Sequence, residues 1–159
     1  DGKGFITGLK SKNFLLKNKK ICIFGAGGAA VSIACSIARE EIMSLKIINR
    51  DLTKADNLLK KIKTISNDLK VEIANIKDNY FLSEIDIIIN ATSLGLNKND
   101  KLPFDVTESS PGSVIADIIM QPEETELLKT AKNLGRSIHY GKYMIESQIN
   151  LAGNFLDLW

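Results

Sequence analysis

One stretch of this chain constrains the fold more than any other: a short apolar run leads directly into a glycine-rich turn. The run covers Lys20–Phe24, and the turn over residues 25–28 reads Gly-Ala-Gly-Gly. An apolar run bounded by glycine is typical of a buried parallel strand, and the apolar spacing of Ala29–Glu41 is helical. Strand, glycine turn and helix in this order suit the diphosphate of a dinucleotide. The glycines let the backbone approach closely, and the free N–H groups at the helix start point toward the anion.

The end of the next predicted strand, Leu45–Ile48, indicates which dinucleotide is bound. A site that prefers NAD places Asp or Glu there, where the carboxylate accepts a hydrogen bond from the ribose 2′-hydroxyl. Here Asn49 and Arg50 follow the strand, and Lys54 comes one helical turn later. A contact between arginine and phosphate contributes roughly 1.5–3 kcal/mol, which is about a tenfold to hundredfold preference. The sequence therefore predicts NADP rather than NAD; the alternative is that Arg50 only caps a solvated loop.

The rest of the chain continues the alternation of strands and helices. Asp51 can cap a helix whose apolar residues recur at helical spacing. Further strands are expected at Val71–Asn75, Asp86–Asn90, Val114–Ile119 and Arg136–Tyr140, and further helices at Gly2–Leu16, Thr125–Leu134 and Met144–Trp159. This order predicts an α/β fold, a Rossmann-like, doubly wound and mostly parallel sheet. The polar stretch over residues 97–110 is expected to be a loose surface loop.

Polar or small residues stand at the ends of several predicted strands. Gly25, Asn49, Asn90, Asp117 and Gly141 all fall at or just after a strand end. In an open parallel sheet, ligands bind outside the carboxyl ends of the strands, near the point where the strand order reverses. These groups are therefore expected to line one binding edge, although Asn90 could simply cap the turn that follows it.

Composition bounds the class of protein. The 159 residues make one globular domain, with 21 basic and 19 acidic side chains and a net charge of +2. That balance argues against a nucleic-acid or membrane partner. Cys22 and Cys35 lie among apolar residues with no metal or disulfide spacing, so small buried side chains in a reducing compartment are expected. Without a signal-peptide pattern, the prediction is a cytoplasmic protein with no metal site.

Five segments together resemble the shikimate dehydrogenase family, and the resemblance spans nearly the whole chain. They are Asp1–Phe5, Gly25–Ala29, Asn49-Arg50 with Lys54, Asn90–Gly95 and Gly141–Gln148. The related glutamyl-tRNA reductases share the glycine turn and the Asn-Arg pair, but not the first and last segments. The family reversibly reduces 3-dehydroshikimate to shikimate with NADPH, in aromatic amino-acid biosynthesis.

Members of this family have a substrate domain and a nucleotide domain, with catalysis in the cleft between them. The likeness here is to the nucleotide domain alone, so residues 1–159 are expected to form the NADP-binding domain, with the N-terminal substrate domain absent from this chain. The resemblance implies that the glycine turn holds the diphosphate and that Asn49, Arg50 and Lys54 hold the 2′-phosphate. The full set of implied cofactor residues is Gly25, Ala26, Gly27, Gly28, Ala29, Asn49, Arg50, Lys54, Asn90, Thr92, Ile118, Gly141 and Met144.

Three further positions are implied to face the substrate. Asp1 matches an aspartate that works with a lysine of the other domain at the reacting hydroxyl, and Gln148 matches a glutamine that hydrogen-bonds substrate. Met120 stands where the family usually has a substrate-contacting tyrosine, which makes quinate or another polyol acid a conceivable substrate. No lysine of this chain matches the family's catalytic lysine, so the chain alone is expected to bind NADP and to turn over little or no substrate.

Two other functions compete with this hypothesis: a non-catalytic NADP-binding module and a glutamyl-tRNA reductase-like domain. The presence of both Asp1 and Gln148 favours the dehydrogenase, because cofactor binding alone needs neither. Without the resemblance, Gln148 would be interpreted as a surface residue of an amphipathic helix. A structural role, hydrogen-bonded or exposed, is favoured for His139 over a catalytic one.

Overall fold

The computed structural model describes residues 1–156, which form a six-stranded, entirely parallel sheet in the order β3-β2-β1-β4-β5-β6. The strands are β1 (Lys20–Phe24), β2 (Ser44–Asn49), β3 (Lys70–Asn75), β4 (Ile87–Asn90), β5 (Val114–Asp117) and β6 (Ser137–His139). The helices are α1 (Gly2–Ser11), α2 (Gly28–Ile37), α3 (Leu52–Ile65), α4 (Glu126–Asn133) and α5 (Lys142–Phe155), with a 3₁₀ turn at Val106–Glu108. The predicted doubly wound fold is confirmed. Of the predicted last helix, Trp159 lies outside the described residues.

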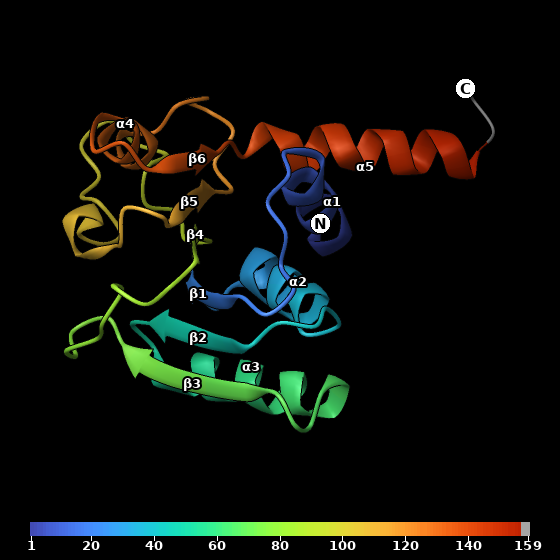
Figure 1. Cartoon of the computed structure of the whole chain (residues 1–159), viewed down its shortest axis with the longest axis horizontal. Helices are drawn as coiled ribbons and strands as arrows, with labels where there is room; N and C mark the ends of the chain where they lie inside the picture. The colour runs from blue at the N-terminus through green and yellow to red at the C-terminus, as the bar shows by residue number, and fades with distance from the viewer. Residues whose placement is uncertain (157–159) are drawn as a thin grey trace.

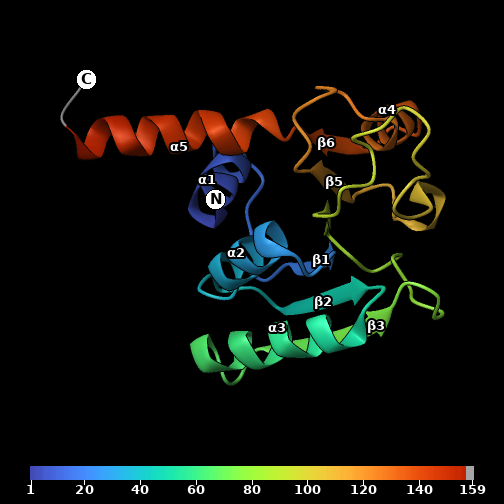
Figure 2. The ribbon, with the colours of Figure 1, turned by 180° about the vertical axis from the view of Figure 1, so that it is seen from behind.

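The sheet separates two apolar layers. On one face, Ile23 and Ile47 pack with α1, α2 and α3 in the larger core cluster. On the other face, Phe24 and Ile88 pack with α4 and with the loops that follow β3 and β4. Figures 1 and 2 show the helices and strands from two opposite sides, with α5 extending beyond the sheet. Strands buried on both faces explain the continuous apolar runs in the sequence.

Helix α1 packs closely against α5, although the two lie at opposite ends of the chain (Figure 1). A Cβ atom at Gly4 would lie 2.5 Å from the Met144 carbonyl oxygen, and one at Gly8 would lie 3.2 Å from the Tyr143 carbonyl oxygen. Both distances are shorter than ordinary van der Waals contact, so glycine at these positions lets the two helix backbones approach. The opening glycine-rich segment is thus explained by packing between helices.

The two cysteines behave as expected. Cys22 and Cys35 are both buried and unpaired. Burial raises the pKa of the Cys22 thiol, which keeps it protonated.

The prediction of a loose surface loop over residues 97–110 is wrong for its second half. Phe104 and Val106 are only 4% and 1% exposed, and the segment includes the 3₁₀ turn. The Phe104 ring stacks on Phe24, the last residue of β1, with the ring centroids 4.6 Å apart. The polar composition of the stretch concealed two apolar anchors, which tie this loop to the strand that leads into the glycine turn.

Candidate cofactor site

A pocket of about 770 Å³ opens at the carboxyl ends of β1, β2 and β4. This is the edge predicted from the strand-end residues, and it spans β1 and β4, between which the strand order reverses. The pocket is lined by these implied cofactor residues: Gly25, Ala26, Gly27, Asn49, Arg50, Lys54 and Thr92. Six others lie outside its lining: Gly28, Ala29, Asn90, Ile118, Gly141 and Met144.

The glycine turn combines one strained position with two open ones. Gly25 has a φ of +113°, and a Cβ there would lie 2.7 Å from the Ala91 carbonyl oxygen, so the fold itself requires glycine. A Cβ at Gly27 or Gly28 would meet nothing within 4 Å. Within residues 1–156, no hydrogen bond takes up the backbone N–H groups of residues 26–29. Free donors beside open space at the start of α2 fit the anionic diphosphate of a dinucleotide.

The second wall of the pocket carries two cations whose backbone is held in place. Asp51 caps α3 by accepting hydrogen bonds from the N–H groups of Thr53 and Lys54 at 2.9 and 3.2 Å, which confirms the predicted cap. Asn49 Nδ2 donates to the Asp51 carbonyl oxygen at 2.8 Å. Arg50 and Lys54 are exposed, and neither forms an ion pair with any carboxylate among residues 1–156. Their positive charge remains available to an anion in the pocket.

Asn90 orders the turn after β4, which forms a third wall of the pocket. It is fully buried, and its Nδ2 donates to the Leu94 carbonyl oxygen at 3.0 Å and to Asp117 Oδ1 at 3.1 Å. Its Oδ1 accepts from the Thr92 hydroxyl at 2.6 Å and from the Thr92 N–H at 3.1 Å. Asn90 thus caps the turn that places Thr92 in the pocket lining. This agrees with the alternative prediction that Asn90 caps the turn that follows its strand. Direct contact between Asn90 and a cofactor stays a prediction.

A buried carboxylate joins the ends of β4 and β5. Asp117 Oδ2 accepts from the Thr125 hydroxyl at 2.8 Å, and Oδ1 accepts from the Ile119 N–H at 3.0 Å. Burial raises the pKa of Asp117, while these hydrogen bonds oppose the shift. The carboxylate is fully engaged within the protein, so its role is to order the strand ends.

The residues implied for the nicotinamide end lie beside one another. A Cβ at Gly141 would lie 2.6 Å from the Ile118 carbonyl carbon, so the ends of β5 and β6 meet there. Met144, three residues later, is only 7% exposed and belongs to the core, whereas Met120 is 37% exposed. The structure thus groups Ile118 with Gly141, outside the large pocket.

The two residues implied to act at the substrate meet across the α1–α5 contact. Gln148 Nε2 donates to Asp1 Oδ1 at 2.8 Å, although 147 positions separate them in the sequence. Both side chains reach the surface there. Sequence reasoning named each residue separately, and the fold brings them into direct contact.

Some pocket residues were missed by sequence reasoning: Ile76, Tyr80, Lys101, Leu102 and Phe104. The Tyr80 ring meets Phe24 edge-on, with the centroids 5.6 Å apart, and burial raises the pKa of its hydroxyl. One signal could have pointed to this wall: apolar residues flank Pro103 within an otherwise polar stretch.

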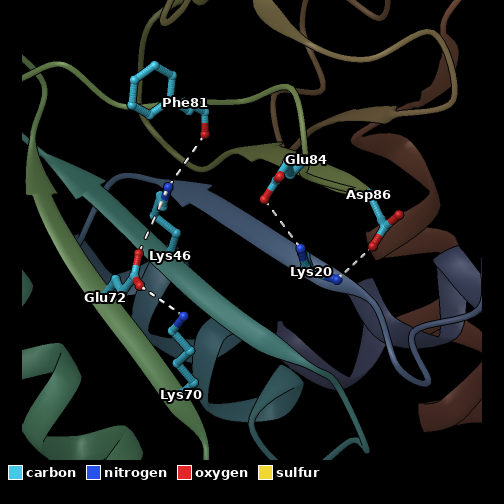
Figure 3. Close-up of polar contacts among 7 residues, drawn as sticks. All are labelled: Lys20, Lys46, Lys70, Glu72, Phe81, Glu84 and Asp86. Atoms are coloured by element: carbon cyan, nitrogen blue, oxygen red, sulfur yellow. Dashed lines mark hydrogen bonds and ion pairs between the residues drawn. The ribbon is translucent and has the colours of Figure 1, made fainter.

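A second pocket, of about 480 Å³, lies at the amino ends of β1, β2 and β3. Figure 3 shows its lysines paired with glutamates. Lys20 Nζ lies 3.4 Å from Glu84 Oε2, and Glu72 lies 3.4 Å from Lys70 and 4.0 Å from Lys46. The charges in this pocket are largely compensated by the protein itself.

His139 is structural, but not in the expected way. It is fully buried, and neither ring nitrogen has a hydrogen-bond partner within the described part of the chain. The ring packs against Phe5, Phe14 and Tyr143. Burial, reinforced by the nearby charge of Lys12, lowers the pKa of His139 to about 4. A neutral, enclosed ring of this kind serves packing.

The sheet order and the pocket at its switch point define a Rossmann-like α/β domain. The chain belongs to the shikimate dehydrogenase family: the family model described as shikimate / quinate 5-dehydrogenase matches residues 8–109. Within residues 1–156, no helix is long and apolar enough to cross a membrane.

Similar proteins extend this result. A shikimate dehydrogenase (NADP(+)) of Nitrosopumilus maritimus is 35% identical over 160 residues, covering 100% of this chain and 56% of that protein. A crystal structure of a shikimate dehydrogenase in complex with NADP+ is 33% identical, with a TM-score of 0.83 over 92% of this chain and 52% of the other. The quinate dehydrogenase of Corynebacterium glutamicum, in complex with NAD, is 25% identical, with a TM-score of 0.82 over the same shares. The chain spans about half the length of the curated relatives it matches.

Proposed function

We propose that this chain binds NADP and forms the nucleotide-binding domain, residues 1–159, of an NADP-dependent shikimate dehydrogenase. The observation that carries the proposal is that Arg50 and Lys54, which pair with no carboxylate among residues 1–156, share a pocket with the glycine turn. A 2′-phosphate is the group that distinguishes NADP from NAD, and arginine binds phosphate through charge-assisted hydrogen bonds. The N–H groups of residues 26–29 would then hold the diphosphate. The remaining implied contacts, at Ile118, Gly141 and Met144, belong to the same proposal.

The proposed reaction is the reversible reduction of 3-dehydroshikimate to shikimate. NADPH supplies the hydride, and the substrate oxygen takes up a proton. Asp1 is proposed to act in that proton transfer with the family's lysine, and Gln148 to hydrogen-bond substrate beside it. Their 2.8 Å hydrogen bond supports a shared site, because it holds the Asp1 carboxylate at the end of α1. The substrate-binding domain and its lysine are proposed partners of this chain, and a cytoplasmic location stays a prediction.

A calorimetric titration tests the cofactor half of the proposal. The chain is titrated with NADPH and, in parallel, with NADH, and the titrations are repeated with Arg50→Ala. We expect at least about tenfold tighter binding of NADPH, with the preference lost in the variant. Equal binding of both cofactors would show that Arg50 is a bystander, and binding of neither would refute the cofactor assignment.

The substrate half is tested in the full-length protein. Reduction of 3-dehydroshikimate by NADPH is compared between the wild type and Asp1→Asn, which keeps the size of the side chain but removes its charge. Turnover that disappears in the variant, with unchanged NADPH affinity, supports the proposed role of Asp1. An equally active variant would exclude that role, and no turnover in the wild type would favour a non-catalytic NADP-binding module.

A quinate/shikimate dehydrogenase is the second candidate function, and Met120 is the observation that favours it. Met120 is 37% exposed just beyond the end of β5, where the family usually has a substrate-contacting tyrosine. Replacing a hydroxyl by a thioether removes one hydrogen-bonding group from the substrate side. Comparing oxidation of shikimate and quinate, in the wild type and in Met120→Tyr, decides between the two functions.

A further inference from the structure

We infer that Lys101 contacts a phosphate group of the bound dinucleotide, as a third cation beside Arg50 and Lys54. This inference rests on the proposed function and adds a residue that the sequence motifs did not indicate. Lys101 lines the same pocket from a different wall, the loop that follows β4.

The backbone is anchored just before Lys101. The Asp100 carboxylate accepts hydrogen bonds from the N–H groups of Gly95 at 2.9 Å and Asn97 at 3.0 Å. These bonds lower the pKa of Asp100, so the carboxylate stays ionised and the turn stays closed at neutral pH. The chain therefore enters Lys101 from a fixed turn.

The backbone is anchored again just after Lys101. Pro103 is buried, and Phe104 stacks on Phe24 with the ring centroids 4.6 Å apart. Phe24 directly precedes the glycine turn, so this stack ties the loop to the proposed diphosphate site. Lys101 is thus held within three residues of a buried anchor, while its own side chain stays exposed.

Two acidic groups lie close to Lys101 in sequence, Asp100 and Asp105, and Asp105 also lines the pocket, but neither forms an ion pair with Lys101. Asp100 accepts the two backbone bonds described above. Asp105 Oδ1 accepts from the Thr107 N–H at 2.9 Å and from the Thr107 hydroxyl at 2.6 Å. Lys101 itself forms no hydrogen bond or ion pair with any of residues 1–156, in contrast to Lys20, Lys46 and Lys70. Its charge is left free toward the pocket.

A free ammonium group in a pocket that already holds two other cations fits a multiply charged anion. An NADP molecule offers two such groups, the 2′-phosphate and the diphosphate, and an ammonium group binds either as a point charge. Both NADPH and NADH carry the diphosphate, but only NADPH carries the 2′-phosphate. Comparing the two cofactors therefore shows which group Lys101 contacts.

The test is a calorimetric titration of Lys101→Gln with NADPH and NADH, with Lys98→Gln as the matched control. Lys98 lies three residues earlier on the same loop, is exposed and does not line the pocket. We expect Lys101→Gln to weaken NADPH binding about threefold to tenfold and Lys98→Gln to leave it unchanged, because an exposed charge contact is partly screened. Lys101→Arg, which keeps the charge, should retain most of the affinity.

Each outcome decides the inference. Loss for NADPH alone supports contact with the 2′-phosphate, and equal loss for both cofactors supports contact with the diphosphate. If Lys101→Gln binds both cofactors as Lys98→Gln does, the inference is wrong while the proposed function stands, provided that Arg50→Ala still abolishes the NADPH preference. If the wild-type chain binds neither cofactor, both proposals fail. Circular dichroism of each variant confirms that the fold is retained.

Discussion

The two edges of the β1–β2–β3 half of the sheet carry similar basic side chains, but these side chains form ion pairs at one edge and none at the other among residues 1–156. At the amino edge, Lys20, Lys46 and Lys70 are paired with glutamates (Figure 3). At the carboxyl edge, Arg50, Lys54 and Lys101 line a pocket and pair with no carboxylate in the part of the chain that the structure describes. A count of basic residues would not separate the two edges, because three line each pocket. Charge compensation, rather than the number of charges, distinguishes the proposed ligand site from the other edge.

The backbone reinforces this difference. At the carboxyl edge, unbonded N–H groups at the start of α2 add partial positive charge to that of the cations. The amino ends of parallel strands offer no comparable helix start, because the helices that follow β1 and β2 begin at the other edge. The pairs at the amino edge are mostly exposed, and each contributes about 0–1 kcal/mol to stability. Removing a charge at the amino edge should therefore change stability little. Removing a cation at the carboxyl edge should weaken the proposed binding of the cofactor.

The largest expected effect follows from filling the open space in the glycine turn. Gly27→Val should lower NADPH affinity more than about a hundredfold, because its side chain displaces at least two charge-assisted hydrogen bonds of about 1.5–3 kcal/mol each. Stability should change little, since Gly27 has an ordinary extended backbone and a Cβ there meets nothing within 4 Å. Calorimetric titration and urea unfolding measure the two effects.

The matched control is Gly25→Ala, two residues earlier. Its positive φ and the short approach to Ala91 predict a stability loss of about 1–3 kcal/mol in the chain without cofactor. If Gly27→Val destabilises the chain as much as Gly25→Ala does, the open space is not a ligand site and the comparison of the two edges loses its basis.

His139 differs from the cations of both edges: within residues 1–156 its ring nitrogens have no hydrogen-bond partner, but the ring is fully buried. Its pKa of about 4 lies below the value of about 6.5 expected in the unfolded chain, so folding favours the neutral ring. The corresponding stability is fully present above about pH 6.5 and is lost as the pH falls toward 4, by about 2–3 kcal/mol. Urea unfolding at pH 7 and pH 4.5 measures this loss.

A variant isolates the histidine from other titrating groups. In His139→Leu, the difference in stability between the two pH values should shrink by the same amount. An unchanged difference would mean that carboxylates, and not His139, cause the acid sensitivity. The NADPH affinity of His139→Leu at pH 7 should stay within about twofold of the wild type, because a side chain without access to solvent binds no ligand.

We expect a smaller effect from removing a cation of the carboxyl edge. Arg50→Ala should weaken NADPH binding about tenfold to hundredfold and leave NADH binding unchanged. Lys70→Ala at the amino edge, the matched removal of a cation, should change neither affinity. Parallel titrations measure both, and equal losses in the two variants would indicate a general electrostatic effect in place of a specific contact.

The smallest effect is expected when a glutamate of the amino edge is neutralised. Glu72→Gln should cost at most about 1 kcal/mol of unfolding free energy, because its side chain is half exposed and its pairs are 3.4 Å or longer. NADPH affinity should not change. Chemical unfolding and titration test this, and a measurable gain in NADPH affinity would show that the two edges communicate.

Sequence reasoning succeeded where local chemistry determines structure. The strand Lys20–Phe24 was predicted with both its ends, and the Asp51 cap was predicted from residue type alone. It failed for residues 97–110, because the burial of Phe104 depends on Phe24, eighty positions earlier in the chain, and local polarity suggested a solvated loop. The contact between Asp1 and Gln148 likewise needed the three-dimensional packing of α1 on α5. Lysine pairing at the amino edge was equally invisible, since it depends on strand register.

The packing of α1 on α5 also orders events during synthesis of the chain. Helix α1 precedes every strand of the sheet in the chain, yet its close partner is α5, which follows them all, and the two residues that join these helices are 147 positions apart. Such distant partners delay the final step of folding, because the intervening chain must be made first. The residues that line the carboxyl-edge pocket lie between Gly25 and Asp105, whereas the position of Asp1 is fixed only after α5 has been made. The pocket therefore forms from an earlier and more local part of the chain than the contact that positions Asp1.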